Sequence, residues 1–149
     1  MIKHSETRKV RYSSEKMFEL VADIENYPNF IPWCDFVRIN SSFLSPNTKI
    51  KILNADMRVY FKVFKETLTS EVTIDQESKV IKVEYVKGPF KFLRNQWIFE
   101  SVGAECMIKF YVEFEFKSKL MQRLTGLIFH EAMKRIVKAF EARANELYD

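Results

Sequence analysis

Residue types that could perform acid–base or nucleophilic chemistry are scattered along this chain of 149 residues. The candidates are Asp23, Glu25, Asp35, Asp56, Glu66, Cys34, His4 and His130. Their spacing matches no GxSxG, HExxH, phosphate-loop or dinucleotide motif. The sequence places no histidine beside Cys34 to activate its thiol, so we expect a small buried side chain there. We expect Asp23 and Asp35 at turns or caps and His130 inside a helix, and predict a protein without catalytic residues.

Cysteine and histidine are too few and too dispersed to indicate a metal site. Cys34 and Cys106 form no CxxC motif, and the chain has two histidines; this spacing is not that of a metal or redox centre. The first residues lack the apolar core of a secretory signal, and no stretch approaches the roughly 18 apolar residues of a membrane helix. We therefore expect a reduced, cytoplasmic protein that can lie peripherally on the inner membrane.

The composition leaves two interpretations of the interior open. The chain contains 14 Phe, six Met and three Gly, and 47% of its residues are hydrophobic. Aromatic residues most often pack a core, but the same rings could line an incompletely filled interior. The length predicts one domain, residues 1–149.

The charge is modestly positive, with a net charge of +4 and a sequence pI near 9.0. A solvated helix face would explain the basic residues near the C-terminus, and a surface for anionic lipid or RNA is the alternative. These residues are Lys117, Lys119, Arg123, Lys134, Arg135, Lys138 and Arg143.

Hydrophobic periodicity predicts a strand and then a helix at the N-terminus. Residues His4 to Arg11 have strand character, and Ser13 or Ser14 can cap a helix that ends near Asp23. The apolar positions of this helix are Met17, Phe18, Leu20 and Val21. The following segment contains two prolines, and a residue before proline favours extended conformations, so the chain must turn there.

The middle of the chain, from Phe36 to Lys117, alternates with a period of two and predicts about six antiparallel strands. The clearest alternation has Ile108, Phe110, Val112, Phe114 and Phe116 on one face. A similar pattern includes Met57, Val59, Phe61 and Val63, and another includes Val72 and Ile74. Ile50 and Ile52 have the opposite parity to Met57, which predicts a β-bulge near Asn54–Ala55 that bends the sheet.

From Lys119 to Tyr148 the period becomes helical and predicts one long terminal helix. Gly126 interrupts its apolar stripe and could permit a bend or a close approach to the sheet. These elements together predict an α+β fold in which the helix buries its stripe on one sheet face.

Several segments resemble the Coq10/RatA family of START-like domains, which belongs to the polyketide-cyclase and lipid-transport superfamily. The opening segment Phe18 to Cys34, FELVADIENYPNFIPWC, is the most informative, and Lys87 to Phe99, KGPFKFLRNQWIF, is the second. Val59–Tyr60–Phe61–Lys62 with Thr69–Ser70, and Phe140 with Ala142, extend the resemblance along the chain. It implies a helix-grip fold: a curved antiparallel sheet wrapped around a long C-terminal helix, with a hydrophobic cavity between them.

Two positions depart from the family pattern. Val63 stands at a hairpin position where many relatives have Gly, and Glu71 stands where a basic residue is frequent. The second departure weakens any function that needs positive charge on that strand, whereas we expect the fold to tolerate both.

If the protein binds a lipid, its site needs apolar volume and few polar groups. The expected cavity lining is Phe30, Trp33, Phe61, Phe90, Trp97, Phe99, Phe110, Phe114, Leu124, Ile128 and Ile136. Tyr27, Pro28 and Pro32 would form a stiff lid loop, with Tyr27 or Trp33 placing a polar tip at the mouth. Core packing, and a fixed turn for the loop, are the competing interpretations.

The resemblance implies a carrier of ubiquinone or a related polyprenyl lipid that supports respiration, needs no cofactor and contacts a membrane surface transiently. The alternative is a RatA-like protein that associates with the large ribosomal subunit and inhibits subunit association and translation. An enzyme such as a cyclase ranks third. We expect no DNA binding, and the sequence lacks the aromatic signature of a common RNA-binding module.

Overall fold

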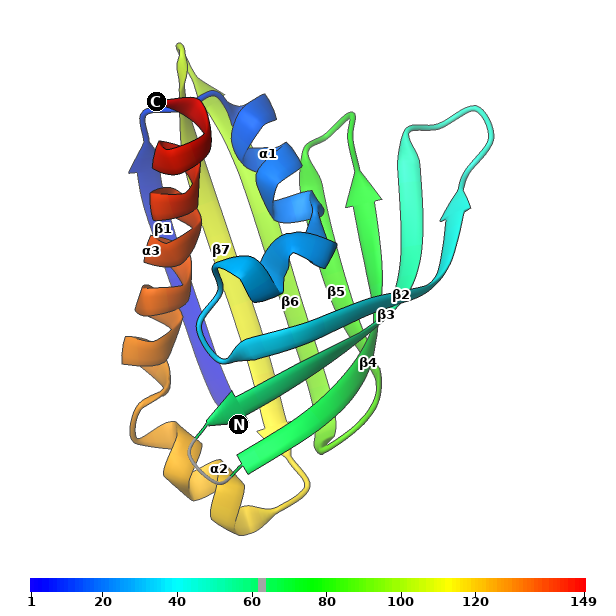
Figure 1. Cartoon of the computed structure of the whole chain (residues 1–149), viewed down its shortest axis with the longest axis vertical. Coiled ribbons are helices and arrows are strands. Elements are labelled where there is room, and N and C mark those ends of the chain that lie inside the picture. The colour runs from blue at the N-terminus through cyan, green and yellow to red at the C-terminus, as the bar shows by residue number, and fades with distance from the viewer. Residues whose placement is uncertain (62–63) are drawn as a thin grey trace.

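The computed structural model describes residues 1–61 and 64–149. A seven-stranded antiparallel sheet curves around helices on one of its faces (Figure 1). The elements in chain order are β1 (Ile2–Val10), α1 (Ser14–Ala22), the 3-10 helix η1 (Ile24–Asn29), β2 (Cys34–Leu44), β3 (Ile50–Phe61), β4 (Phe64–Asp75), β5 (Val80–Lys87), β6 (Phe90–Val102), β7 (Glu105–Phe116), α2 (Lys119–Gly126) and α3 (Phe129–Tyr148).

The strands β2 to β7 form an antiparallel meander, and β1 lies at the edge of the sheet beside β7. The strand order is β1-β7-β6-β5-β4-β3-β2, so the first strand pairs with the last and β2 to β7 follow as neighbours. The predicted six-strand meander after the first helix is therefore confirmed. Along β7, Cys106, Ile108, Phe110, Val112, Phe114 and Phe116 are all buried, which confirms the alternation predicted for this strand.

The first helix forms as its sequence predicts. Ser13 is the N-cap, and its hydroxyl accepts a hydrogen bond from the backbone N–H of Lys16. Met17, Phe18, Leu20 and Val21 are buried against the sheet, and Asp23 caps the C-terminus as expected.

The predicted β-bulge lies one strand away from its expected position. The pairing of β3 with β4 runs without a register shift from Ile50 to Phe61. The shift lies instead in β2, where Ile39 pairs with Ala55 and Ser41 pairs with Asn54, leaving Asn40 as the extra residue. The change of parity in β3 arises because Leu53, Ala55, Met57 and Val59 face inward, whereas Ile50 and Ile52 lie on the other face of the strand.

The prediction of one long terminal helix is wrong, because two helices occupy the segment. Helix α2 ends at Gly126, and Ile128 has φ −123° and ψ −2°, outside the helical region. The break allows Phe129 to turn into the core, where it is 2% exposed and packs on Phe114 with ring centroids 4.6 Å apart. In one straight helix the apolar residues of both halves would lie on the same side. The curved sheet does not extend along the whole of that side, so it could not bury them all.

Asp35 does not lie in a turn but in β2, where it forms an ion pair with Arg58 at 2.7 Å. Val63 lies outside the described residues. Glu71 is exposed on β4. No helix in the described part of the chain is long and apolar enough to cross a membrane.

Candidate ligand-binding cavity

A cavity of about 240 Å³ lies between the concave face of the sheet and the helices. Strands β2 to β7 form its floor and walls, η1 and the residue Ile31 form one part of its cover, and α3 forms the other. The lining residues are Ile24, Tyr27, Ile31, Val37, Ala55, Met57, Val59, Leu68, Ser70, Val72, Ile81, Val83, Phe90, Leu93, Asn95, Trp97, Phe110, Val112, Met133, Ile136 and Phe140. Apolar side chains dominate this set, as in sites that bury most of a small ligand.

Phe140 joins the two parts of the cover. Its ring lies edge-on to Tyr27 and Phe30 of the loop, with centroids 5.3 Å apart in each pair, and 5.0 Å from the ring of Trp97 on the floor. Trp97 in turn packs on Phe110 at 4.6 Å. Edge-to-face contacts of this kind hold rings in defined positions, so the cover and floor are connected by aromatic packing at this end of the cavity.

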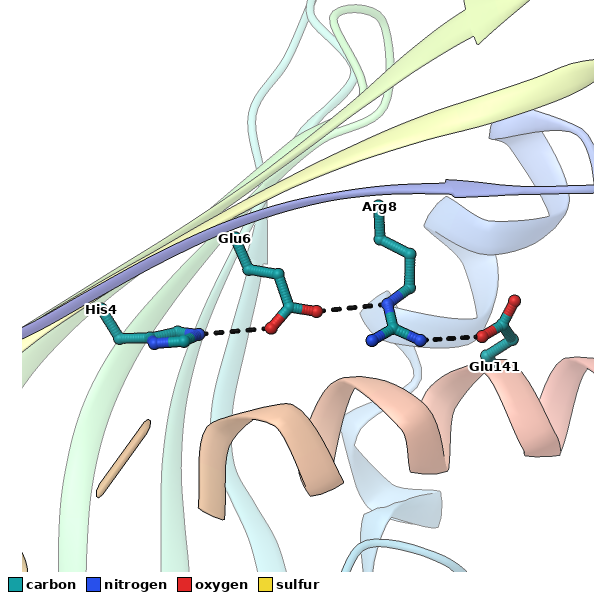
Figure 2. Close-up of polar contacts among 4 residues, drawn as sticks. All are labelled: His4, Glu6, Arg8 and Glu141. Carbon is teal, nitrogen blue, oxygen red and sulfur yellow. Dashed lines mark hydrogen bonds and ion pairs between the residues drawn. The ribbon is translucent and has the colours of Figure 1, made fainter. Parts of the chain in front are cut away.

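A row of polar contacts holds α3 against the edge strand β1 (Figure 2). His4 Nε2 lies 3.3 Å from Glu6 Oε1, Arg8 Nε donates to Glu6 Oε2 at 3.2 Å, and Arg8 Nη1 donates to Glu141 Oε1 at 3.0 Å. His4 Nδ1 also lies 2.9 Å from His130 Nδ1 at the start of α3. These contacts position the helix that carries Met133, Ile136 and Phe140 over the cavity.

Burial keeps one tyrosine and both cysteines in their neutral forms. Burial raises the pKa of Tyr27, whose hydroxyl donates to the carbonyl oxygen of Val21. Burial also raises the pKa of Cys34 to about 11 and that of Cys106 to about 11, so both thiols stay protonated at neutral pH. Both cysteines are free and buried. In the described ranges, 1–61 and 64–149, no three His, Cys, Asp or Glu side chains gather in a way that could hold a metal ion.

The structure brings part of the expected lining together at this cavity. Phe90, Trp97, Phe110 and Ile136 line it, and so does Tyr27 from the predicted lid loop. Pro28 and Pro32 are half-buried in that loop without lining the cavity. Whether these residues bind a ligand stays a prediction.

Other expected residues lie elsewhere. Phe30 covers Phe140 from outside the cavity, and Phe99 packs under α1 on Phe18 with centroids 5.9 Å apart. Phe114 belongs to the core beneath Phe129. Trp33 has φ 66°, a left-handed conformation that a residue with a bulky side chain rarely adopts, and its ring packs on Phe61 at 5.8 Å.

Leu124 and Ile128 were expected at the cavity and are instead exposed, at 51% and 37%. The reason is the break between α2 and α3, which turns their side chains away from the sheet.

Sequence reasoning missed most of the aliphatic lining, including Val37, Ala55, Leu68, Val83 and Met133. The signal was available, because strand alternation had already placed Met57, Val59 and Val72 on the inner face. The prediction selected aromatic residues and did not use this alternation. A cavity exists where side chains are too short to meet, so aliphatic and small residues mark it better than large rings do.

A second hollow of about 340 Å³ lies between α1, η1 and the strands β2, β3 and β4. Charged residues contribute to its wall, among them Glu19, Asp23, Glu25, Lys49 and Lys51. Its mixed lining contrasts with the apolar interior of the first cavity.

Known proteins with similar sequences belong to a family that is consistent with this fold and its apolar cavity. Residues 10–141 match the family model described as polyketide cyclase / dehydrase and lipid transport. The chain is 36% identical to the ribosome association toxin RatA of Escherichia coli over 97% of this chain and 87% of that protein. It is 33% identical to the coenzyme Q-binding protein COQ10 homolog B of Xenopus laevis, over 99% of this chain and 59% of that protein.

Among solved structures, a START superfamily protein from Mycobacterium smegmatis superposes with a TM-score of 0.81 at 18% identity, covering 97% of this chain and 98% of that one. The similarity confirms the helix-grip, START-like fold. The chain therefore belongs to the polyketide cyclase / dehydrase and lipid transport family and is a relative of the RatA and COQ10 proteins.

Proposed function

We propose that this protein binds a hydrophobic molecule in the cavity and carries it without chemical change. The observation that supports this most strongly is the apolar interior of about 240 Å³ beneath α3 and η1. Binding gains on the order of 25 cal/mol for each Å² of apolar surface removed from water. Such a site needs volume and shape, and the described residues of its lining offer no pair of acid–base groups.

The preferred ligand is ubiquinone or a related polyprenyl lipid. A relative that spans the whole of this chain is named as a coenzyme Q-binding protein. The cavity is slightly smaller than the roughly 300–1,000 Å³ of typical sites for drug-sized ligands. It therefore suits a head group or the first few isoprene units, and the remainder of a long tail would lie outside the cavity or enlarge it by moving the cover.

Direct binding tests this proposal. The chain has two tryptophans, and Trp33→Phe leaves Trp97, which lines the cavity, as the reporter. Titration with decylubiquinone should quench Trp97 fluorescence to saturation, and mass spectrometry of an organic extract of the purified protein should detect a prenyl quinone or another apolar lipid. Absence of both saturable quenching and co-purified lipid would overturn the proposal.

A second candidate function is association with the ribosome, and the similarity to RatA favours it. Lys134, Arg135 and Lys138 are exposed on α3 and could neutralise phosphates of ribosomal RNA. Co-sedimentation with large ribosomal subunits in sucrose gradients tests it. Association that falls steeply as salt increases would support this function, whereas sedimentation of all protein at the top of the gradient at low salt would reject it.

A further inference from the structure

The hydroxyl of Ser70 is a buried polar group on the cavity wall. Ser70 lies in β4 and is 6% exposed, and its Oγ atom has no hydrogen-bond partner among residues 1–61 and 64–149. Buried hydroxyl groups are nearly always paired, because burial without a partner costs free energy. An unpaired hydroxyl that lines a cavity therefore needs an explanation.

The other polar groups on this lining are already paired. Asn95 accepts from Trp97 Nε1 at 3.1 Å and donates to the backbone oxygen of Tyr111 at 2.8 Å. Tyr27 donates to the backbone oxygen of Val21. Thr69, the neighbour of Ser70 in sequence, donates to Asp56 at 2.6 Å. Among the described residues of the lining, Ser70 is thus the one whose side-chain hydroxyl has no hydrogen-bond partner.

Small side chains lie at and opposite the hydroxyl of Ser70 on the cavity floor. The partner of Ser70 across the β3–β4 pair is Ala55, and both residues line the cavity. Their side chains are among the smallest in the lining, whereas the flanking residues Leu68 and Val72 are larger. The Oγ atom of Ser70 is covered in the free protein. Because both side chains here are small, rotation of the Ser70 side chain can bring the hydroxyl to the polar end of a ligand.

We propose that Ser70 is the hydrogen-bonding anchor of the ligand. The ligand class is an apolar molecule that carries a carbonyl, ether or hydroxyl oxygen on the part that enters the cavity. A hydroxyl group both donates and accepts, so each of these oxygens is a suitable partner. This inference rests on the proposed ligand-binding function and specifies which end of the ligand lies on the floor formed by β3 and β4.

A pair of ligands tests the anchor. Decylubiquinone carries carbonyl and ether oxygens, and decylbenzene has the same alkyl chain without them. Ser70→Ala should weaken decylubiquinone binding roughly 3- to 10-fold, the effect of one neutral hydrogen bond, and leave decylbenzene binding unchanged. Ser14→Ala is the matched control, because it removes a buried hydroxyl that is paired with Ser101 at 2.6 Å, outside the cavity.

Thermal unfolding of the free protein gives an independent measurement. Ser70→Ala should keep or raise the Tm, since it removes an unpaired buried hydroxyl, whereas Ser14→Ala should lower it. Equal decylubiquinone affinity in Ser70→Ala and the parent protein would overturn the anchor while leaving the cavity function intact. An equal loss of both ligands in Ser70→Ala would also overturn it. Failure of the parent protein to bind either ligand would overturn the proposed function and the anchor together.

A second surface carries an independent inference. Helix α2 buries none of its residues, and Leu120, Leu124 and Leu127 are 64%, 51% and 80% exposed. Together with Ile128, these residues form an apolar patch, which we call the α2 patch. Contiguous exposed apolar side chains mark interaction sites more often than isolated ones do.

The charged residues within the segment that carries the α2 patch are all basic. Lys117, Lys119 and Arg123 are exposed and form no ion pair within the described part of the chain. From Lys117 to His130 the sequence contains no Asp or Glu. Apolar residues bordered by unpaired cations complement an anionic lipid surface, where leucines enter the acyl boundary and cations meet the headgroups. An RNA surface would use the cations but has no matching site for four aliphatic side chains.

We propose that the α2 patch docks on an anionic membrane. Helix α2 is fixed to the cavity body, since Gln122 Oε1 accepts from the backbone N–H of Phe116 at 2.8 Å. It also directly precedes α3 in the chain (Figure 1), and α3 carries the cavity-lining residues Met133, Ile136 and Phe140. Docking therefore places the helical cover of the cavity next to the lipid that supplies or receives the ligand.

Vesicle co-sedimentation tests the docking. The protein should bind vesicles of equal phosphatidylcholine and phosphatidylserine, and bind vesicles of phosphatidylcholine alone at least about tenfold more weakly. Leu124→Gln combined with Leu127→Gln should reduce binding to the anionic vesicles by a similar factor. The control is Leu147→Gln, which changes a leucine that is 50% exposed on α3. Equal binding to both vesicle types, full binding by the double variant, or binding to purified ribosomes with the same variant dependence but not to vesicles would overturn the inference.

Discussion

Helices α2 and α3 follow one another in sequence and share a pattern of apolar residues, yet they have opposite environments. Helix α3 buries Phe129, Val137, Phe140 and Ala144 against the sheet, whereas α2 buries none of its residues. The difference shows that an apolar stripe identifies the face of a helix that is stabilised by burial. The stripe does not identify what buries that face, which can be the same chain, a ligand or another surface.

The geometry of the sheet explains the division. Helix α3 lies along the concave face, so most of its large apolar side chains meet either the core or the cavity. Helix α2 lies beyond the end of β7, where the sheet no longer extends beneath it (Figure 1). The same residue types that stabilise the fold in α3 are therefore available for an external partner in α2.

The largest expected difference between the helices is in their response to a buried charge. Val137→Asp places a carboxylate at a position that is 2% exposed and should reduce the free energy of unfolding by about 4 kcal/mol. Leu124→Asp introduces the same side chain on α2, where Leu124 is 51% exposed, and should change it by less than about 0.5 kcal/mol. Urea unfolding followed by circular dichroism measures both. Comparable losses would show that α2 packs on the domain as α3 does.

The sequence is sufficient to predict the type and order of most elements, but it does not predict where α2 ends and α3 begins. Strand alternation identifies β7, and the capping serines Ser13 and Ser14 identify the start of α1, because both signals depend on local residue spacing. The end of α2 depends on a distant contact, since Phe129 leaves the helical path to pack on Phe114. Local periodicity cannot record a contact that forms only after β7 is in the sheet.

The sequence predicted a hydrophobic cavity between the sheet and the terminal helix, but only part of its lining residues. Phe110 was identified because inward parity and aromatic character coincide in it, and Phe90 and Trp97 were identified as aromatic residues of the segment Lys87 to Phe99 that resembles the family. Ser70 and Ala55 were missed as lining residues, because a small side chain on an inner face has the same sequence signature whether it touches a neighbour or borders empty volume. Which of the two occurs depends on the curvature of the sheet and on where α3 lies.

A second contrast concerns the half-buried methionines of the two helices, Met133 on α3 and Met121 on α2. Met133 lines the cavity, so Met133→Trp should fill part of its volume of about 240 Å³ and weaken decylubiquinone binding at least about tenfold. Met121→Trp, outside the cavity lining, should leave the affinity within about twofold. Isothermal titration calorimetry measures both affinities, and circular dichroism checks that each variant is folded. Equal affinities would show that the ligand does not occupy the space beneath α3.

A smaller effect is expected from the ion pair that ties α3 to β1. Arg8 donates to Glu141 at 3.0 Å, with side-chain exposures of 24% and 36% (Figure 2). A double-mutant cycle with Arg8→Met and Glu141→Gln should give a coupling free energy of about 0.5–1 kcal/mol in urea unfolding.

The ion pair between Arg143 and Glu146 is a suitable comparison, because both residues lie within α3 at i,i+3. Its cycle, with Arg143→Met and Glu146→Gln, should give about 0.3 kcal/mol. If the pair inside the helix couples more strongly than the pair between the elements, the row of contacts along β1 does not hold α3 in place.

The smallest expected effect concerns Gly126, the last residue of α2. A Cβ atom added there would meet Ile2 Cδ1 at 3.8 Å, an ordinary van der Waals contact, so Ala fits without strain. Gly126→Ala should stabilise the protein by about 0.5 kcal/mol in urea unfolding, because Ala restricts the unfolded chain and favours helix. The backbone chemical shifts of Leu127 and Ile128 should stay unchanged, since burial of Phe129 and not the flexibility of Gly126 sets the break. Helical shifts at Ile128 in the variant would contradict this cause and assign the break to the glycine.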